Sequence, residues 1–477
     1  MPTIGVLSAG VFGLFALSML LPLFVSLVEG NWRAFEAFFL VIVSYGFLSA
    51  ATILALNSRL RTLNRAGVFT AAITVWLSLV TAATPAFLLV EGHSLIRAVF
   101  EATSAVTTLG TTLRPLSDIS PSMAFYRGTL GWIGGFTTLT LAAYVLGAYQ
   151  VGGTPNANLR HIQHSRTEND PRILVTLRSI ALPYLTLTIA CAVLLVIVRI
   201  PADTAIITAM SMLATNGFIP AEPGGTVLGN RFAELIMMVF MVVGATSIVW
   251  HRLLLSRLGK GSREHAEAML YLTALAVLLV LAVIASVLAP PLGRTGFESA
   301  FNYIFDIVSI ATTTGITHDE RLGVSIPFEV ILIIVFVGGC SYSTAGGIKA
   351  FRLATMLKHV GNELDRLVYP SAMLRDDVQY DANQRVIAKA VWSTFFLAVL
   401  TVTIGMLLFA AQGHGLPAAM ALAVGAFSQV GNLAASAIPG LSEGVVSDGT
   451  LLTLSALALV ARIEILVLLA AITGNRW

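Results

Sequence analysis

Four short segments of small and hydroxyl-bearing residues recur along the chain, and each ends in a glycine. These four glycine segments read Thr107-Thr108-Leu109-Gly110, Ala214-Thr215-Asn216-Gly217, Thr312-Thr313-Thr314-Gly315 and Ser428-Gln429-Val430-Gly431. The glycines follow one another at intervals of about 100 residues, and a small residue stands six positions before each. A period of this kind indicates a tandem repeat.

The chemistry open to these segments is cation binding by main-chain oxygen. Glycine adopts backbone angles closed to other residues, and it leaves no side chain to obstruct a narrow pore. Rings of backbone carbonyls can replace the water shell of a dehydrated cation, and Thr hydroxyls add oxygen ligands. No Asp or Glu occurs in the four segments, which argues against a divalent-cation pore built on carboxylates. A single Thr-x-Gly sequence is an ordinary turn, so the pore interpretation depends on the fourfold recurrence.

The composition indicates what must hold these segments in place. Hydrophobic residues make up 56% of the 477 residues and charged residues only 11%, against about 25% in soluble proteins. A chain with so little polar surface needs lipid as its solvent. The net charge of +3 does not indicate nucleic-acid binding, and the two cysteines indicate neither a disulfide framework nor a zinc site.

Ten apolar stretches are long enough to span a bilayer, which takes about 20 residues. They lie at 4–29, 34–56, 67–91, 125–149, 177–200, 232–256, 269–291, 327–348, 390–412 and 450–472. Most Lys and Arg residues fall in alternate connections, and the positive-inside rule places those connections in the cytoplasm. We therefore expect a multi-pass plasma-membrane protein with both termini cytoplasmic.

A shorter apolar stretch precedes each glycine segment and is too short to span. These half-spans lie at 93–106, 203–214, 296–311 and 416–427. Irregular backbone at membrane depth must be buried in protein or line a wet cavity, so we expect four re-entrant loops around one axis. Each half-helix would point its negative C-terminal end toward a cation there.

The expected fold is an all-α membrane protein with ten transmembrane helices and four re-entrant pore loops in pseudo-fourfold repeats. Residues 1–66 form two extra N-terminal helices. The four repeats occupy 67–150, 151–260, 261–375 and 376–477.

A glycine-rich break interrupts the span at 327–348. It contains Gly338, Gly339, Ser343, Thr344, Gly346 and Gly347, and each glycine disfavours helix by about 1 kcal/mol relative to Ala. One interpretation is a flexible gate beneath the glycine segments. The other is a site where helices cross closely, since small residues allow this in membranes.

Several charged residues need an explanation. Arg462 lies inside the last span, where a charge should face the bundle interior or water; we expect it below the glycine segments as a positive barrier, with snorkelling to the cytoplasm as the alternative. Arg97 and Glu101 are four residues apart and could pair across one helical turn. Nearly all histidines, His161, His164 and His318 among them, are expected to be solvated loop residues.

Several motifs together resemble the Trk-type potassium uptake proteins of the Trk/Ktr/HKT superfamily, over nearly the whole chain. They are Phe100-Glu101-Ala102-Thr103-Ser104-Ala105 before Thr108-Leu109-Gly110, Phe125-Tyr126-Arg127 with Trp132-Ile133-Gly134-Gly135, the run from Gly338 to Lys349, and Ala461-Arg462-Ile463-Glu464. Some residues depart from the family pattern: Leu109 and Gln429 stand where Thr is expected, Asn432 where Pro is expected, and Tyr342 and Ala345 where Gly is usual.

The resemblance implies potassium uptake across a bacterial inner membrane. The four glycine segments would bind potassium as a selectivity filter, and residues 338–347 with Arg462 would gate the pathway below it. It further implies one pore per chain, a homodimer, and a cytoplasmic nucleotide-binding regulatory ring as partner.

Two other classes of function fit the sequence less well. A secondary transporter of a small solute would place broken helices at a midplane site, but such proteins usually contain two inverted repeats. The half-spans here all lie on the non-cytoplasmic side of the predicted weave. An enzyme is not expected, because the chain contains no Walker motif, no dinucleotide fingerprint and no nucleophile–base set.

Overall fold

The computed structural model describes residues 2–60, 63–154, 172–220, 227–255, 263–288, 296–318, 327–368, 378–438, 441 and 446–473. These residues form helices and connections, with no strand among them. The helices are α1 Pro2–Ser18, α2 Leu20–Glu29, α3 Trp32–Leu56, α4 Arg65–Leu89, α5 Leu95–Val106, α6 Pro121–Leu141, α7 Gly147–Tyr149, α8 Arg172–Ile197, α9 Ala202–Ala214, α10 Arg231–Ala245, α11 Ile248–Leu255, α12 Arg263–Leu288, α13 Gly296–Ala311, α14 Phe328–Val337, α15 Ala350–Val368, α16 Val378–Ala411, α17 Leu416–Ser428, α18 Gly431–Ser436, α19 Asp448–Ile463 and α20 Ile465–Thr473. The all-α class predicted from the sequence is confirmed.

Seven helical stretches in the described part of the chain are long and apolar enough to cross a membrane. The bent pair α19–α20, with an angle of 84° between the helices, makes an eighth if it counts as one span. The remaining two predicted spans are interrupted. The stretch 232–256 breaks between α10 and α11 at Thr246–Ser247, and 327–348 contains only α14 before its glycine-rich break.

The half-spans expected from the sequence correspond to α5, α9, α13 and α17, with bounds that agree within two residues. Each packs against its neighbours in sequence: α5 against α4 and α6, α9 against α8 and α10, α13 against α12 and α14, and α17 against α16 and α19. Small buried residues such as Ala102, Ala209 and Ala423 line these helices, and small side chains let membrane helices approach closely. The four short helices are thus held inside the bundle.

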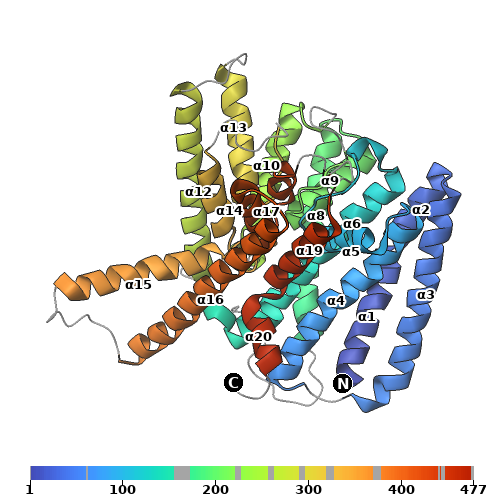
Figure 1. Ribbon diagram of the computed structural model, residues 1–477, viewed down its shortest axis with the longest axis horizontal. Helices are drawn as coiled ribbons and strands as arrows, with labels where there is room; N and C mark the ends of the chain where they lie inside the picture. The colour runs from blue at the N-terminus through green and yellow to red at the C-terminus, as the bar shows by residue number, and fades with distance from the viewer. Residues whose placement is uncertain are drawn as a thin grey trace.

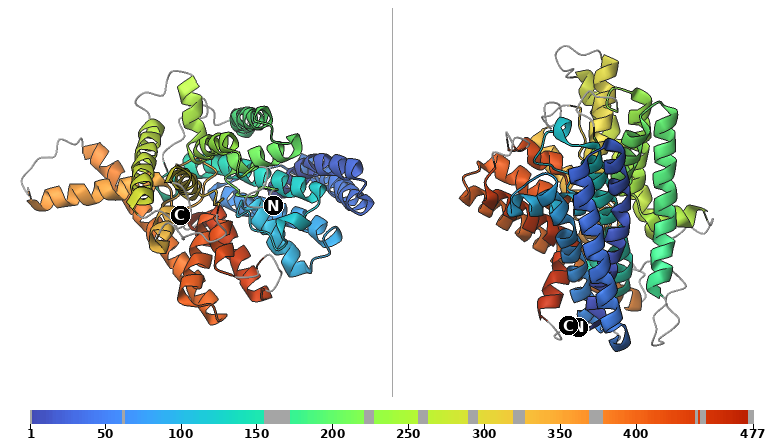
Figure 2. Two further views of the ribbon diagram at one scale, coloured as in Figure 1. Left: turned by 90° about the horizontal axis from the view of Figure 1, so that it is seen from above. Right: turned by 90° about the vertical axis from the view of Figure 1, so that its right-hand side faces the viewer.

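The arrangement in space shows how the remaining helices are distributed. Helices α1 to α3 stand together at one side of the molecule, α12 and α13 stand at the other, and α15 extends outward from the bundle (Figure 1). The beginning of α1 and the end of α20 lie at the same end of the molecule (Figure 2). Which side of a membrane this end faces stays a prediction.

Candidate functional site

The four glycine segments meet in a closed ring. A Cβ atom added to any of the four glycines would collide with the next segment, so glycine alone fits. A Cβ added to Gly110 would lie 1.8 Å from the Asn216 carbonyl oxygen, and one added to Gly217 would lie 2.2 Å from the Thr314 carbonyl oxygen. A Cβ added to Gly315 would lie 2.8 Å from Val430 Cγ1, and one added to Gly431 would lie 2.1 Å from the Leu109 carbonyl oxygen. Each segment therefore touches the next, and the fourth touches the first. The first and third segments lie opposite each other.

Each segment is tied back to the short helix that precedes it. The carbonyl of the small residue six positions before the glycine accepts a hydrogen bond from the segment's backbone. These bonds run from Leu109 N–H to Ser104 (2.9 Å), from Asn216 to Ser211 (3.0 Å), from Thr314 to Ser309 (2.9 Å) and from Val430 to Gly425 (2.8 Å). The small residue that recurs six positions before each glycine in the sequence is therefore the residue whose carbonyl accepts this bond.

The backbone of the segments is held in unusual conformations. Thr108, Thr215 and Thr313 have φ of 63°, 49° and 59°, and Gln429 has 61°. Positive φ is rare for a β-branched residue, and such strain occurs mainly at functional sites. Gly110, Gly217 and Gly315 also have positive φ. The fourth segment differs from the other three, because Gly431 is already the first residue of α18.

The carbonyls of the first three segments lack the backbone partners that buried carbonyls normally have. No backbone N–H of the described residues donates to any carbonyl in these three segments. Their residues are almost entirely buried, with Thr108 and Thr313 at 0% exposure. More than about 90% of buried backbone carbonyls are paired in folded proteins. Side chains donate to the Thr107, Ala214 and Gly315 carbonyls. The other carbonyls of these segments have no hydrogen-bond partner among the described residues, so their oxygens are available to a dehydrated cation.

Arg462 lies directly beneath this ring. Its Nε donates to the Thr107 carbonyl at 2.6 Å, its Nη1 donates to the Thr344 carbonyl at 2.9 Å, and its Nη2 contacts the Thr108 hydroxyl. The side chain therefore reaches the first glycine segment and the glycine-rich break at once, and it does not snorkel to the cytoplasm. A fixed positive charge at this place repels a cation leaving the ring.

The glycine-rich break approaches the other three segments. The Thr344 hydroxyl lies 3.3 Å from that of Thr215, and the Gly346 N–H donates to the Thr313 hydroxyl at 2.8 Å. A Cβ added to Gly346 would lie 1.9 Å from the Ser428 oxygen. The break and Arg462 together contact all four segments from below.

The break is folded back on itself and onto α10. Gly338 and Gly347 have positive φ, and a Cβ on Gly338 would lie 2.0 Å from the Gly346 oxygen. The Cys340 and Thr344 N–H groups donate to the carbonyls of Ala245 and Gly244. Those bonds take up carbonyls at the end of α10, which explains why that helix stops there.

The two departures from the family pattern inside the break are accommodated by packing. Tyr342 is 2% exposed, and a Cβ added to Gly147 would lie 2.4 Å from its hydroxyl. Ala345 is fully buried beside Gly339. Tyr342 therefore fills space between the break and Gly147, and Ala345 fills space within the break.

A cavity of about 70 Å³ lies below the break. Its polar lining includes Lys349, Arg352, Arg462 and Glu464. Lys349 Nζ donates to the Ala345 carbonyl, and Arg352 pairs with Glu464 at 2.8 Å while donating to the Gly152 carbonyl at 3.2 Å. Glu464 therefore pairs with Arg352 in the lining of the cavity.

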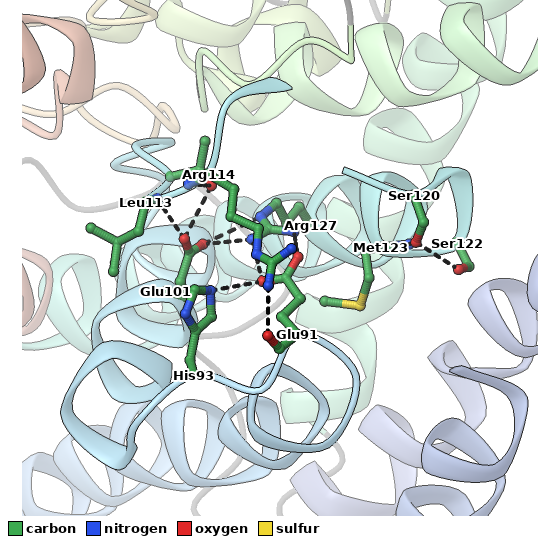
Figure 3. A network of polar contacts seen from close by, with 10 residues as sticks. Glu91, His93, Glu101, Leu113, Arg114, Ser120, Ser122, Met123 and Arg127 are labelled. Carbon is green, nitrogen blue, oxygen red and sulfur yellow. Dashed lines mark hydrogen bonds and ion pairs between the residues drawn. The ribbon is translucent and has the colours of Figure 1, made fainter. Parts of the chain in front are cut away.

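A buried ionic network supports the first glycine segment from outside the ring (Figure 3). Arg127 on α6 pairs with Glu101 on α5 at 2.9 Å and with Glu91 at 2.7 Å. Glu101 also accepts from the Leu113 N–H at 2.6 Å and from the Thr112 hydroxyl at 3.0 Å. We call Glu91, Glu101 and Arg127 the first brace. It fixes the chain directly after the first glycine segment.

The first brace corrects the expectation that Glu101 pairs with Arg97, because its carboxylate is occupied by Arg127 on another helix. Glu91, His93 and Glu101 also place ligand atoms within 4.8 Å of one another. The Arg127 guanidinium already bonds both carboxylates, so we do not interpret the group as a metal site. Burial raises the pKa of Glu91, but the charge of Arg127 and the hydrogen bonds from His93 and Arg127 together lower that pKa to about 2.

A second network supports the third glycine segment. His318, three residues after Gly315, lies 3.3 Å from Asp306 on α13 and 3.2 Å from Glu234 on α10. Glu234 also pairs with Arg231 at 2.9 Å and accepts from the Gly229 N–H. We call Glu234, Asp306 and His318 the third brace. It joins the third segment to a helix of the second repeat.

His318 contradicts the expectation of a solvated loop histidine. Its side chain is 12% exposed, and its ring packs edge-on against Phe305. Burial lowers the pKa of His318, but the hydrogen bonds with Asp306 and Glu234 raise it to about 9. His161 and His164 lie outside the described residues.

Comparisons with known proteins agree with this architecture. The sequence model of the TrkH family, described as a cation transport protein, matches residues 34–289 and 297–474. The chain is 30% identical to the Trk system potassium uptake protein TrkH of Salmonella typhimurium, covering 97% of this chain and 96% of that protein. It is 26% identical to TrkG of Escherichia coli over 97% and 96% of the two chains.

A solved structure extends the comparison to the fold. The crystal structure of the potassium transporter TrkH from Vibrio parahaemolyticus matches with a TM-score of 0.85 at 26% identity, covering 100% of this chain and 99% of that one. The family model matches far more than half of the chain. The chain therefore belongs to the TrkH family of cation transport proteins.

Proposed function

We propose that the chain conducts potassium ions across the plasma membrane, inward, through the ring of the four glycine segments. The observation that carries the proposal is the closed ring of buried carbonyls without backbone partners. Relatives that align over nearly their full length are potassium uptake proteins by name. Transport, and not catalysis, is the activity that these features support.

The potassium sites would be built from the residues of the four segments. A potassium ion exchanges its water shell for main-chain oxygens in such a ring. The Thr hydroxyls at 107, 108, 215, 312, 313 and 314 offer further oxygens, and Leu109 and Gln429 keep the carbonyl while losing a hydroxyl. Gln429 donates its side-chain amide to the Ala458 carbonyl at 2.8 Å, so it anchors the fourth segment to α19.

The gate would consist of the glycine-rich break and Arg462. Gly338, Gly339, Ser343, Thr344, Gly346 and Gly347 close the lower side of the ring, and the Arg462 charge opposes ion passage. Opening then requires the hydrogen bonds from Arg462 and Thr344 to break. The Arg352–Glu464 pair at the cytoplasmic end of the break would hold the closed form.

The assembly is proposed on family grounds. We infer a homodimer with one pore per chain, cytoplasmic termini, and a cytoplasmic regulatory ring that binds nucleotides. Helix α15 lies outside the bundle and exposes the apolar residues Leu357, Leu364 and Leu367. Lipid or protein must cover them. Coexpression with a candidate ring subunit and copurification would test this part separately.

The central test measures ion flux in liposomes containing the purified protein, with potassium and sodium compared. In Gly110→Ser, the added Cβ meets the Asn216 oxygen and the residue must keep a φ of 76°. We expect the preference for potassium to fall by at least about tenfold, a cost of ~1.4 kcal/mol.

The matched variant is Gly46→Ser, whose Cβ would meet nothing within 4 Å. It should behave as wild type. Equal flux of both ions in the wild type, or unchanged selectivity in Gly110→Ser, would overturn the proposal. Saturable binding of an amino acid or sugar, without potassium flux, would instead favour a secondary transporter.

A further inference from the structure

One side chain makes direct contact with the outer end of the ring. The Asn432 side-chain amide donates a hydrogen bond to the Gly315 carbonyl at 2.6 Å. Asn432 belongs to α18 in the fourth repeat, and Gly315 ends the third glycine segment. The bond therefore joins two neighbouring segments at the last carbonyl before the outside.

The corresponding carbonyls in the first two segments have no such partner. Within the described residues, no side chain donates to the Gly110 or Gly217 carbonyl, and no backbone N–H does so either. These oxygens keep both lone pairs available to an ion, whereas the Gly315 oxygen shares one with an amide. The outer end of the ring is thus chemically asymmetric.

The position of Asn432 follows from the way the fourth segment ends. Gly431 starts α18, so the chain turns into a helix at the point where the other segments continue as irregular backbone. Val430 and Asn432 stand on either side of Gly431, and both lie at Gly315. A Cβ added to Gly315 would lie 2.8 Å from Val430 Cγ1, and the Asn432 amide bonds the Gly315 carbonyl. A proline at 432 would lack this amide donor.

We propose that Asn432 is a specificity-determining residue, which favours potassium over sodium by holding the Gly315 carbonyl at the spacing of the larger ion. The proposal rests on the proposed function. A sodium ion is smaller, so the surrounding oxygens must move inward to coordinate it. Inward movement of the Gly315 oxygen stretches its bond to Asn432, and that cost falls on sodium alone.

The test compares Asn432→Leu and Asn432→Ala with wild type in the same liposome flux assay. Leu preserves the side-chain shape without a donor, and Ala removes the shape too. A single hydrogen bond of ordinary strength corresponds to about a two- to tenfold change. We expect both variants to lose potassium preference by that factor, mainly through faster sodium entry, while potassium flux is retained.

The matched variant lies on the same short helix. Ser436→Ala removes a hydroxyl that, among the described residues, bonds the Leu433 carbonyl of α18 itself, so its selectivity should equal that of wild type. Wild-type selectivity in both Asn432 variants would overturn the proposal, as would an equal loss in Ser436→Ala. If wild type is selective and Gly110→Ser is not, the proposed function stands whatever the Asn432 variants show.

Discussion

The first and third glycine segments lie opposite each other in the ring, and they are supported in different ways. The first brace is made within one repeat, and its cation is an arginine that stays charged at any ordinary pH. The third brace borrows Glu234 from the second repeat, and its cation is a histidine. Asn432, from the fourth repeat, completes the support of the third segment.

This difference indicates that the two sides of the ring respond to different conditions. The first brace depends on a buried charge pair, which is costly to break but insensitive to protons near neutral pH. The third brace depends on a group that can lose its charge in the alkaline range. In this ring, the support of the first glycine segment is therefore insensitive to pH near neutrality, whereas the support of the third segment changes with alkaline pH.

The largest effect is expected from Arg127→Leu, which leaves Glu91 and Glu101 buried without their cation. The Arg127 and Glu101 side chains are only 3% and 1% exposed. Removal of one partner from a buried pair costs about 3–5 kcal/mol. We expect a corresponding loss of thermal stability in detergent, together with loss of selective potassium flux.

The triple variant Glu91→Gln, Glu101→Gln, Arg127→Leu separates charge from shape. Once all three charges are gone, no uncompensated ion remains, so the triple variant should recover part of the stability lost in Arg127→Leu. If the triple variant is less stable than Arg127→Leu, the brace does not act as an ion pair, and the contrast with the third segment disappears.

Much of the first brace could have been anticipated. Arg127 lies within the predicted span 125–149, where a charge should face the bundle interior or water, and the same argument places Arg462 below the glycine segments. Its partner Glu101 lies 26 positions earlier on another helix, and spacing within one helix pointed to Arg97 instead. Local periodicity does not reveal pairs that only tertiary packing brings together.

The half-helices and the break were predicted closely, because each is bounded by glycine and polar residues in the sequence. The interruption of 232–256 at Thr246–Ser247 was not predicted. It depends on the Cys340 and Thr344 N–H groups, which bond the end of α10 from almost a hundred residues away. The third brace cannot be predicted from the sequence for the same reason, since Glu234 and His318 meet only in the folded bundle.

The second-largest effect is expected at His318, where the potassium preference should depend on external pH. Its folded-state pKa, about 9, lies above the ordinary value near 6.5, so the stabilisation is complete below about pH 6.5 and is lost as pH rises through about 9. We expect the potassium preference of wild type to fall between about pH 7 and pH 10 on the outer side. His318→Gln should already have the lower preference at neutral pH and should show little further change.

His93→Gln serves as the matched variant, because His93 lies beside Glu91 in the first brace. It should keep the alkaline profile of wild type. The same profile in His318→Gln as in wild type would show that protonation of His318 does not control the third segment, and both sides of the ring would then be equally insensitive to pH.

The smallest effect is expected from Thr112→Val, which removes one uncharged donor to Glu101 of the first brace. The Thr112 hydroxyl donates to Glu101 at 3.0 Å and accepts from the Arg114 N–H at 3.2 Å. Because Glu101 keeps Arg127 and the Leu113 N–H as partners, the loss should be about 1.5–3 kcal/mol, the value of a hydrogen bond to a charged group. Thermal unfolding of this variant beside Arg127→Leu measures how much of the brace is ionic. A loss as large as that of Arg127→Leu would mean that the neutral bonds to residues 112–113, and not the charges, hold the first segment in place.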